Sequence, residues 1–322
     1  MTMSNLRAHL GFYLILLAAT WLFGSALYAE EDFESEFMAW AEEFGLLPAS
    51  LSAIGQDGNL LLAAGFANAI DLPRPIASIS KTIAGQCAVH MARQEVLSLK
   101  STTSDFLDWD GPQGDVTVAQ LLTHSSGFGP DSTQRDILGR NLNNYARIQA
   151  VIDDVSTRQM LSSDAGSYSY NNENFLVLEA LMTAAANEDA VSWCKRSVPG
   201  LNLLETLARA DQAEALGFAG GLSISAQDLA LFFHGLTVDD DWPRVLIAGS
   251  NEYGPGVIMQ TTSVGQNIFH VGGICVALGP KFGAFAAQLT SGNSVAALYS
   301  GCADENALGR LNELVLRHLG EP

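Results

Sequence analysis

The chain of 322 residues carries 35 acidic and 16 basic side chains, which gives a net charge of −19. Hydrophobic residues make up 48% of it, enough for the core of one large domain or two moderate ones. The few Lys and Arg residues form no cluster. Binding to nucleic acid is therefore not expected, and the acidity indicates solubility instead.

Residues 1–29 differ in composition from the rest of the chain. An apolar run at 11–23 follows a short basic stretch and leads into small residues, with acidic residues beginning directly afterwards. This order is typical of a secretory signal peptide, with cleavage after Ala26 or Ala29. The alternative is an uncleaved membrane anchor, because residues 10–29 are just long enough to span a bilayer. We expect an exported, periplasmic or secreted protein, associated with a membrane only if this segment is retained.

The first predicted elements are one helix and two strands. Aromatic residues recur at helical spacing between 33 and 44, which predicts an amphipathic helix. Apolar runs at 51–54 and 60–64 flank Asp57 and Gly58. An Asp-Gly pair between two such runs predicts a β-hairpin.

The next predicted element is a long helix that begins with Ser78 and Lys81. These two residues are three apart, so they would share one face of the first turn. Apolar and small residues continue as far as Ala92, which predicts a helix buried almost all round. Burial and the positive end of the helix dipole both disfavour a cation at Lys81. A neutral amine beside a serine hydroxyl can accept its proton and so activate the nucleophile.

A second Ser-x-x-Lys pattern lies at Ser192 and Lys195. It runs into Pro199 and Gly200, so no long buried helix can follow it. We do not expect this copy to be catalytic.

The remaining chain divides into a helical part and a return to strands. Residues 100–245 show short helical patterns and loops with few strand signals. A final helix is predicted at 304–319, capped by Asp304. Strands are predicted at 256–260, 268–271, 284–289 and 296–299.

This order predicts an α/β fold of the α+β type. Residues 30–80 and 246–322 would form an antiparallel sheet flanked by the N- and C-terminal helices. Residues 81–245 would form an inserted, mostly helical region, with the catalytic cleft between the two parts.

The four cysteines are Cys87, Cys194, Cys275 and Cys302. Outside the cytoplasm disulfides can persist, and four cysteines allow three complete pairings between which sequence does not choose. Cys87, on the buried helix, is expected to be a free core residue. The cysteine spacing does not match a metal site, and we expect neither a metal nor an organic cofactor.

Several further motifs accompany Ser78 in chain order: residues 121–127, Tyr170-Asn171-Asn172, Gly220-Gly221-Leu222-Ser223 and His270-Val271-Gly272-Gly273. In this order and spacing the chain resembles the serine β-lactamase and penicillin-binding superfamily. The resemblance covers residues 34–319. It is strongest to the branch of class C β-lactamases, D-alanyl-D-alanine carboxypeptidases, D-amino-acid amidases and related esterases, and it implies a β-lactamase-like fold.

The resemblance also implies roles for the residues around Ser78. Ser78 resembles the acylated nucleophile and Lys81 its proton acceptor. Tyr170 resembles the tyrosine that passes the proton to the leaving group and later activates water. Because a tyrosine is a poor base at neutral pH, we expect a cationic Lys81 to lower the pKa of Tyr170.

The other motifs correspond to binding positions in the family. Asn172 resembles the residue that bonds the lysine and the substrate amide. His270 and Gly272 occupy the strand that lines the cleft. The backbone N–H groups of Gly273 and Ser78 would form the oxyanion hole. His124, within 121–127, is expected to be structural.

One position departs from the family pattern. Val271 stands where the family has threonine, whose hydroxyl helps to hold a substrate carboxylate. His270 also replaces the more common lysine, which weakens the attraction for a carboxylate. These two departures argue against efficient β-lactamase activity.

The sequence therefore predicts an exported serine hydrolase that acts through an acyl-enzyme. Its substrate would be a small molecule or peptide with an ester or amide bond, such as a D-alanyl peptide. The alternative is a weakly active penicillin-binding or sensor protein that acylates without turnover. A purely structural homologue is disfavoured, because both Ser78 and Lys81 are present.

Overall fold

The computed structural model describes residues 32–65, 71–133, 146–161, 165–249 and 251–320. The predicted signal peptide, residues 1–29, lies outside this part of the chain. No helix within the described ranges is long and apolar enough to cross a membrane.

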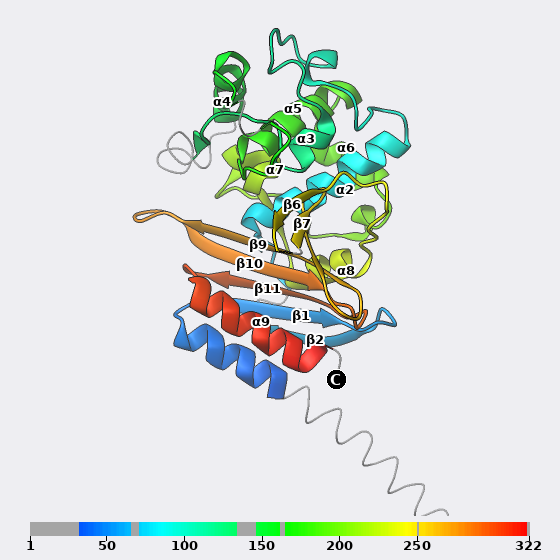
Figure 1. Cartoon of the computed structure of the whole chain (residues 1–322). Helices are drawn as coiled ribbons and strands as arrows, with labels where there is room; N and C mark the ends of the chain where they lie inside the picture. Colours follow the sequence, from blue (N-terminus) through cyan, green and yellow to red (C-terminus); the bar gives the residue numbers. More distant parts are fainter. Residues whose placement is uncertain (1–31, 66–70, 134–145, 162–164, 250, 321–322) are drawn as a thin grey trace, which may run out of the picture.

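An eight-stranded antiparallel sheet forms the centre of the molecule (Figure 1). Its strand order is β2-β1-β11-β10-β9-β8-β7-β6, so strands from the two ends of the chain are neighbours at β1 and β11. This arrangement confirms the predicted antiparallel sheet. The strands are β1 (Ala49–Ile54), β2 (Leu60–Gly65), β6 (Val245–Ala248), β7 (Asn251–Tyr253), β8 (Ile258–Thr261), β9 (Gln266–Cys275), β10 (Lys281–Gln288) and β11 (Ser294–Ser300).

Strands β6 and β7 were not expected from the sequence. They are short, and β7 carries two polar residues of three, so neither shows a strong apolar alternation. A second, three-stranded sheet has the order β3-β5-β4 and lies at the border of the helical part. Its strands are β3 (Arg74–Pro75), β4 (Ala208–Arg209) and β5 (Leu222–Ile224).

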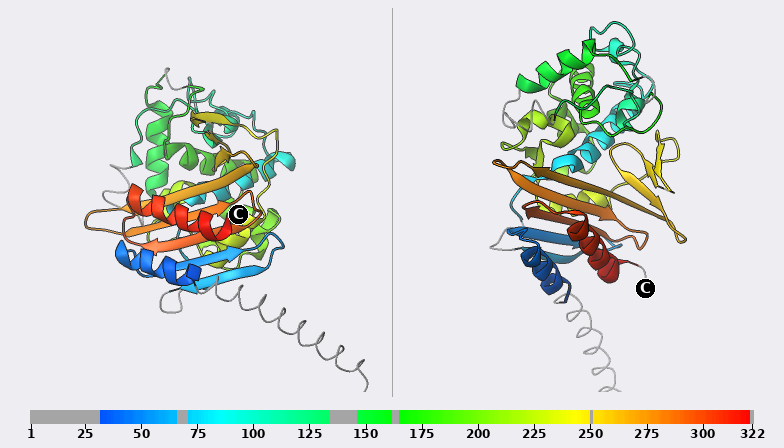
Figure 2. Two further views of the ribbon diagram at one scale, coloured as in Figure 1. Left: turned by 60° about the horizontal axis from the view of Figure 1, so that its bottom comes forward. Right: turned by 60° about the vertical axis from the view of Figure 1, so that its left-hand side comes forward.

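Two helices cover one face of the large sheet, and both were predicted. The helix at 32–43 lies beside α9 (Glu305–Leu319), as two views show (Figures 1 and 2). The aromatic face of the first helix is buried, and its Trp40 donates to the carbonyl of Ala307. The side chain of Asp304 accepts a hydrogen bond from the N–H of Ala307 and so caps α9 as expected.

The opposite face of the sheet supports the helical part (Figure 2). Helix α8 packs on β1, β10 and β11, and α2 runs from the sheet into the helical part. The apolar residues of α2 belong to one large core shared by the sheet and the helices. The helices of this part are α2 (Ser80–Arg93), α3 (Val118–Leu122), α4 (Ala146–Thr157), α5 (Glu173–Ala186), α6 (Ala190–Ser197), α7 (Gly217–Gly220) and α8 (Ala226–His234).

Two disulfides join distant segments. Cys87 is fully buried as expected, but the prediction that it is free is wrong, because it pairs with Cys194. The packing of α2 against α6 brings their Cα atoms to 5.5 Å, within the range that a disulfide requires. The second bridge, Cys275–Cys302, ties the end of β9 to the segment that follows β11.

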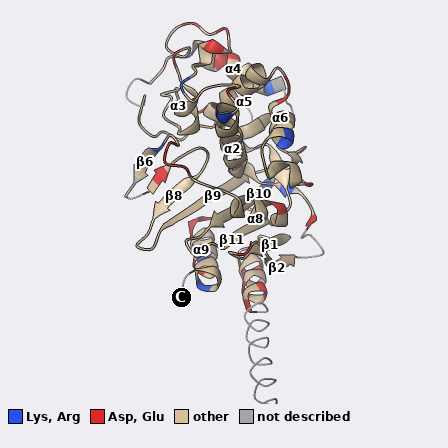
Figure 3. Ribbon diagram, turned by 90° about the vertical axis from the view of Figure 1, so that its right-hand side faces the viewer, with Lys and Arg blue, Asp and Glu red and all other residues tan. Residues whose placement is uncertain are grey.

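Acidic and basic positions are interspersed over both parts of the molecule (Figure 3). Several of the few arginines pair with carboxylates, such as Arg310 with Glu43 and Arg196 with Glu188. These exposed ion pairs contribute little to the free energy of unfolding, but in each of them a carboxylate neutralises the charge of an arginine.

Candidate active site

Ser78 lies at the junction between the two parts. It sits in a single 3₁₀ turn, Ala77–Ile79, and Lys81 follows in the first turn of α2. The sequence predicted one continuous helix, whereas the structure begins it with a tighter turn. Ala77 has φ of 46°, a left-handed conformation that is costly for a residue with a side chain. Such strain commonly occurs at functional positions.

The start of α2 is held by close backbone contacts. A side chain at Gly256, whose φ is 71°, would come within 1.9 Å of the carbonyl oxygen of Lys81. The hydroxyl of Thr82 donates to the carbonyl of Gly256 at 2.7 Å, and the N–H of Leu222 donates to Ser80 Oγ. The segment before β8 and the strand β5 thus fix the turn that carries Ser78.

Lys81 is completely buried beside Ser78. Its Nζ lies 3.2 Å from Ser78 Oγ and 2.8 Å from Asn172 Oδ1, and it also donates to the carbonyl of Ala219. Burial lowers the pKa of Lys81 to about 7, and the carboxylate of Asp131 opposes part of this effect. The predicted depression is confirmed. A large fraction of the amine is neutral near pH 7 and can accept the proton of Ser78.

Tyr170 donates to the same serine oxygen, with 2.8 Å between its hydroxyl and Ser78 Oγ. The residue as a whole is 42% exposed, but desolvation of its hydroxyl raises the pKa of Tyr170 well above its usual value. Its hydrogen bond to Ser78 lowers that pKa only partly, and the charge of Asp131 raises it further. The expected lowering is therefore wrong for the resting site. Tyr170 is protonated at neutral pH and is a donor there.

Asn172 connects Lys81 to a loop that the sequence analysis did not single out. Its Oδ1 accepts from Lys81, while its Nδ2 donates to Asp131 Oδ2 at 2.9 Å and to Thr133 Oγ1 at 3.1 Å. An amide nitrogen has two hydrogens, and both are used here. The bond to Lys81 agrees with expectation. The expected bond to a substrate amide has no free donor in this arrangement.

Strand β9 approaches Ser78 through glycine. A side chain at Gly272 would lie 2.9 Å from the backbone nitrogen of Ser78 and 2.3 Å from the carbonyl oxygen of Ile76. Only glycine allows this contact. The next residue, Gly273, is exposed. The strand therefore runs against the N–H of Ser78, as an oxyanion hole made with Gly273 would require.

His270 is buried two residues before this contact. Its Nδ1 lies 2.9 Å from the carbonyl oxygen of Val271, and its Nε2 lies 3.2 Å from the hydroxyl of Tyr253. Burial, and secondarily the charge of Lys81, lower the pKa of His270 to about 3. The imidazole is neutral, with both ring nitrogens occupied.

Val271 points away from the cleft. Successive side chains of a strand alternate between its faces, so Val271 lies opposite His270 and packs against the core beneath α9. It lines a groove with Phe285 and Leu308 on that side. The expectation that this position faces a substrate carboxylate is therefore wrong, and the argument against β-lactamase activity that rested on it falls away.

His124 lies beneath Tyr170, with 4.3 Å between the ring centroids. It is fully buried, and its Nδ1 accepts from the N–H of Asn171 at 3.3 Å. Phe175 and Tyr253 also pack against its ring. These contacts fit the expected structural role, and they show that His124 supports the ring of Tyr170.

Comparison with known proteins gives a family for this arrangement. Residues 48–319 match the family model described as Beta-lactamase. The chain belongs to the beta-lactamase family. This membership makes it a serine hydrolase in general terms. A sequence comparison with curated proteins finds no match.

Solved structures share the beta-lactamase-like fold at low sequence identity. A D-amino acid amidase from Ochrobactrum anthropi has a TM-score of 0.73 and 14% identity, covering 92% of this chain and 97% of its own. A beta-lactamase/D-alanine carboxypeptidase from Pseudomonas syringae has a TM-score of 0.71 and 15% identity, covering 92% and 100%. A penicillin-binding protein homologue from Pyrococcus abyssi has a TM-score of 0.71 and 17% identity, covering 89% and 77%.

In this beta-lactamase-family chain, the side chains of the second Ser-x-x-Lys pattern make local structural hydrogen bonds. Ser192 Oγ donates to Asp189 at the start of α6, and Lys195 donates to the carbonyl of Leu207 at 2.8 Å. Helix α6 is eight residues long and ends at Ser197, so no long buried helix follows. Among the described residues, no group of three or more His, Cys, Asp or Glu side chains could hold a metal ion.

Proposed function

We propose that this chain is an exported serine hydrolase that forms an acyl-enzyme on Ser78 and acts on ester or amide substrates, including D-alanyl peptides. One observation carries the proposal. Lys81 Nζ and the hydroxyl of Tyr170 both lie within hydrogen-bond reach of Ser78 Oγ, at 3.2 and 2.8 Å. A base and an acid on one serine oxygen are the arrangement that acyl transfer requires.

The acylation step follows from these protonation states. Neutral Lys81 takes the proton of Ser78 as Oγ forms a bond to the substrate carbonyl carbon. The N–H groups of Ser78 and Gly273 would stabilise the oxyanion. As the bond to the leaving group breaks, protonated Tyr170 donates its proton to that group, and the ammonium of Lys81 restores the proton of Tyr170. Water reverses the sequence on the acyl-enzyme, and the serine hydroxyl is regained.

The substrate class is supported by the neutral His270. With both ring nitrogens occupied, this residue offers no positive charge to a substrate carboxylate. Substrates without a carboxylate, such as simple esters and D-amino-acid amides, therefore fit the site better than substrates that need a cation on this strand. The amidase and carboxypeptidase named among the similar structures support an amide or peptide bond as the target.

We expect purified protein to turn over some of the following substrates: p-nitrophenyl esters, D-amino-acid amides, D-Ala-D-Ala peptides and a chromogenic cephalosporin. A fluorescent phosphonate should label Ser78, located by mass spectrometry, and Ser78→Ala should abolish both labelling and turnover. Ser192→Ala should leave both intact, since the Ser192 hydroxyl is bonded to Asp189 at the start of α6. An adduct on Ser192 would contradict the assignment of the nucleophile.

The second candidate is a penicillin-binding or sensor protein that acylates without turnover. The raised pKa of Tyr170 favours it, because a phenol that stays protonated is a weak base for the deacylating water. A burst of one product equivalent without steady release would identify this behaviour. Steady turnover with a synthetic ester would exclude it.

Export is supported by the composition of residues 1–29 and by two disulfides, which persist in oxidising compartments. We expect N-terminal sequencing of the periplasmic protein to begin at Leu27 or Glu30. The full-length chain found only in membranes would favour the anchor instead and would make the enzyme membrane-associated.

A further inference from the structure

A short loop delivers one carboxylate to the back of the active site. Both oxygens of Asp131 are engaged. Its Oδ2 accepts from the N–H and the Nδ2 of Asn172, at 3.1 and 2.9 Å. Its Oδ1 accepts from the N–H and the hydroxyl of Thr133, at 2.8 and 2.5 Å. Four hydrogen bonds onto one carboxylate fix its position, and each of them uses the carboxylate as an acceptor.

This carboxylate determines which way the Asn172 amide faces. The two ends of an amide have almost the same shape, so its partners decide the orientation. An ionised Asp131 can only accept, so Asn172 must present its nitrogen to the loop and its oxygen to Lys81. Thr133 reinforces the choice, because it donates to Asp131 and accepts the second amide hydrogen. Lys81 therefore meets an acceptor at 2.8 Å.

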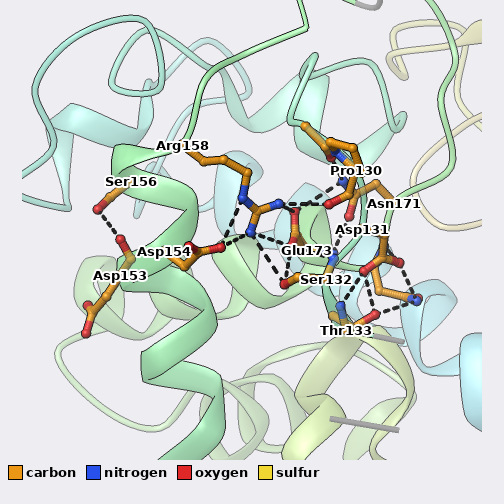
Figure 4. A network of polar contacts seen from close by, with 12 residues as sticks. Pro130, Asp131, Ser132, Thr133, Asp153, Asp154, Ser156, Arg158, Asn171 and Glu173 are labelled. Carbon is orange, nitrogen blue, oxygen red and sulfur yellow. Dashed lines mark hydrogen bonds and ion pairs between the residues drawn. The ribbon is translucent and has the colours of Figure 1, made fainter. Parts of the chain in front are cut away.

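The loop is held in turn by a buried ion pair (Figure 4). Glu173, fully buried at the start of α5, accepts from the N–H and hydroxyl of Ser132 at 2.9 and 2.7 Å. Arg158 pairs with Glu173 through both terminal nitrogens and also donates to the carbonyl of Pro130 at 2.9 Å. The position of Asp131 is thus set by contacts on both sides of it in the sequence.

We propose that Asp131 is a positioning residue for the catalytic base: it orients the Asn172 amide so that the amide oxygen faces Lys81, and it places a carboxylate directly behind that amide. The inference deepens the proposed function and rests on it for the role of Lys81 as base. Asp131 itself touches neither Ser78 nor the reacting atoms in this scheme, since Asn172 lies between it and Lys81.

The groups around Lys81 single out this charge. Burial lowers the pKa values of His124 and His270 and raises the pKa of Tyr170, so these three groups are uncharged. Glu173 is compensated by Arg158. Asp131 is the group whose charge raises the pKa of Lys81 against burial. The uncharged groups that face Lys81 from other elements are His124, His270 and Tyr170.

The test is the pH dependence of Lys81 in Asp131→Asn. This variant lacks the negative charge of Asp131, and it allows the Asn172 amide to turn its nitrogen toward Lys81. Both changes disfavour the ammonium form of Lys81. The rate at which a fluorophosphonate labels Ser78 should rise with pH as Lys81 loses its proton, and we call this rise the acid limb. In the variant the midpoint of the acid limb should move to lower pH by about 0.5–1.5 units. The labelling rate above that limb should fall several-fold, because a weaker base remains. Asp153→Asn is the matched control. It makes the same change of charge on the exposed side of α4 and should change neither the midpoint of the acid limb nor the labelling rate.

Thr133→Val separates orientation from charge. It removes the hydroxyl that accepts from Asn172 but keeps the carboxylate, so labelling should slow while the acid limb moves less than in Asp131→Asn. The folding of Asp131→Asn should be checked by circular dichroism. If the folded variant has the same acid-limb midpoint and the same labelling rate as the wild type, the proposal is wrong.

A second readout does not depend on turnover or on the nucleophile. The titration of Lys81 can be followed by NMR of its Cε in the Ser78→Ala background, with and without Asp131→Asn. A lower midpoint in the double variant supports the proposal even if the wild type is never labelled, in which case the proposed function alone fails. An unchanged midpoint rejects the role of Asp131 even if the wild type is an active hydrolase.

Discussion

Replacing Lys81 with methionine should slow acylation of Ser78 by about 10²–10⁴-fold, the usual contribution of general acid–base catalysis. The side chain is completely buried against the ring of Phe175, and unbranched methionine can fill that space. The substitution removes the only group that we assign to take the serine proton. It also leaves Asn172 Oδ1 and the carbonyl of Ala219 without this donor, at a cost of about 1–3 kcal/mol each. That cost is offset in part because no amine has to be desolvated.

The pH profile shows whether the loss comes from the base. In the wild type, labelling should rise with pH through about 7, because only the neutral amine accepts a proton and its pKa lies there. Lys81→Met should show no such limb over the same range. Lys195→Met, in the second Ser-x-x-Lys pattern, should behave like wild type. Wild-type labelling by a folded Lys81→Met protein at pH 8 would remove Lys81 from the mechanism.

The contacts predicted correctly are those whose signal is local. Ser78 and Lys81 are three apart at the start of a strongly apolar helix, and this pattern alone brings them together. The sheet was predictable for a related reason, since strands such as β10 and β11 are short apolar runs bounded by turn residues. The flanking helices carried their own apolar periodicity and, at Asp304, their own cap.

The features that the sequence left open depend on contacts between distant segments. Asp131 lies 41 residues before Asn172, and an Asp-Ser-Thr stretch by itself signals only a turn. Cys87 and Cys194 are separated by 107 residues and meet only because α2 packs against α6. The face on which Val271 lies depends on the register of β9, and an error of one residue reverses it.

The protonation of Tyr170 shows why a pair of residues is not enough to predict a pKa. From sequence, a neighbouring lysine implies a positive charge that should lower the pKa of a phenol. In the structure both groups are desolvated, and burial disfavours the charged form of each. Above about pH 7 the resting site therefore holds two mostly neutral groups on Ser78 Oγ, one ready to accept a proton and one ready to donate.

Tyr170→Phe should accordingly reduce kcat on amide substrates by about 10²–10⁴-fold. The ring and its contact with His124 remain, while the donor to Ser78 Oγ is lost. An amine leaving group must be protonated as its bond breaks, whereas p-nitrophenolate leaves as an anion. The acylation rate with p-nitrophenyl esters should therefore fall far less than the rate with amides.

This difference between leaving groups distinguishes a proton donor from a structural hydroxyl. Both substrates should be measured by single-turnover kinetics, so that acylation is separated from deacylation. Tyr168→Phe, which removes a hydroxyl from the neighbouring ring, is the matched control and should change neither rate by more than a few-fold. Equal losses on esters and amides would mean that the hydroxyl of Tyr170 orients Ser78 and does not protonate the leaving group. Unchanged kcat on amides in a folded variant would exclude Tyr170 from catalysis altogether.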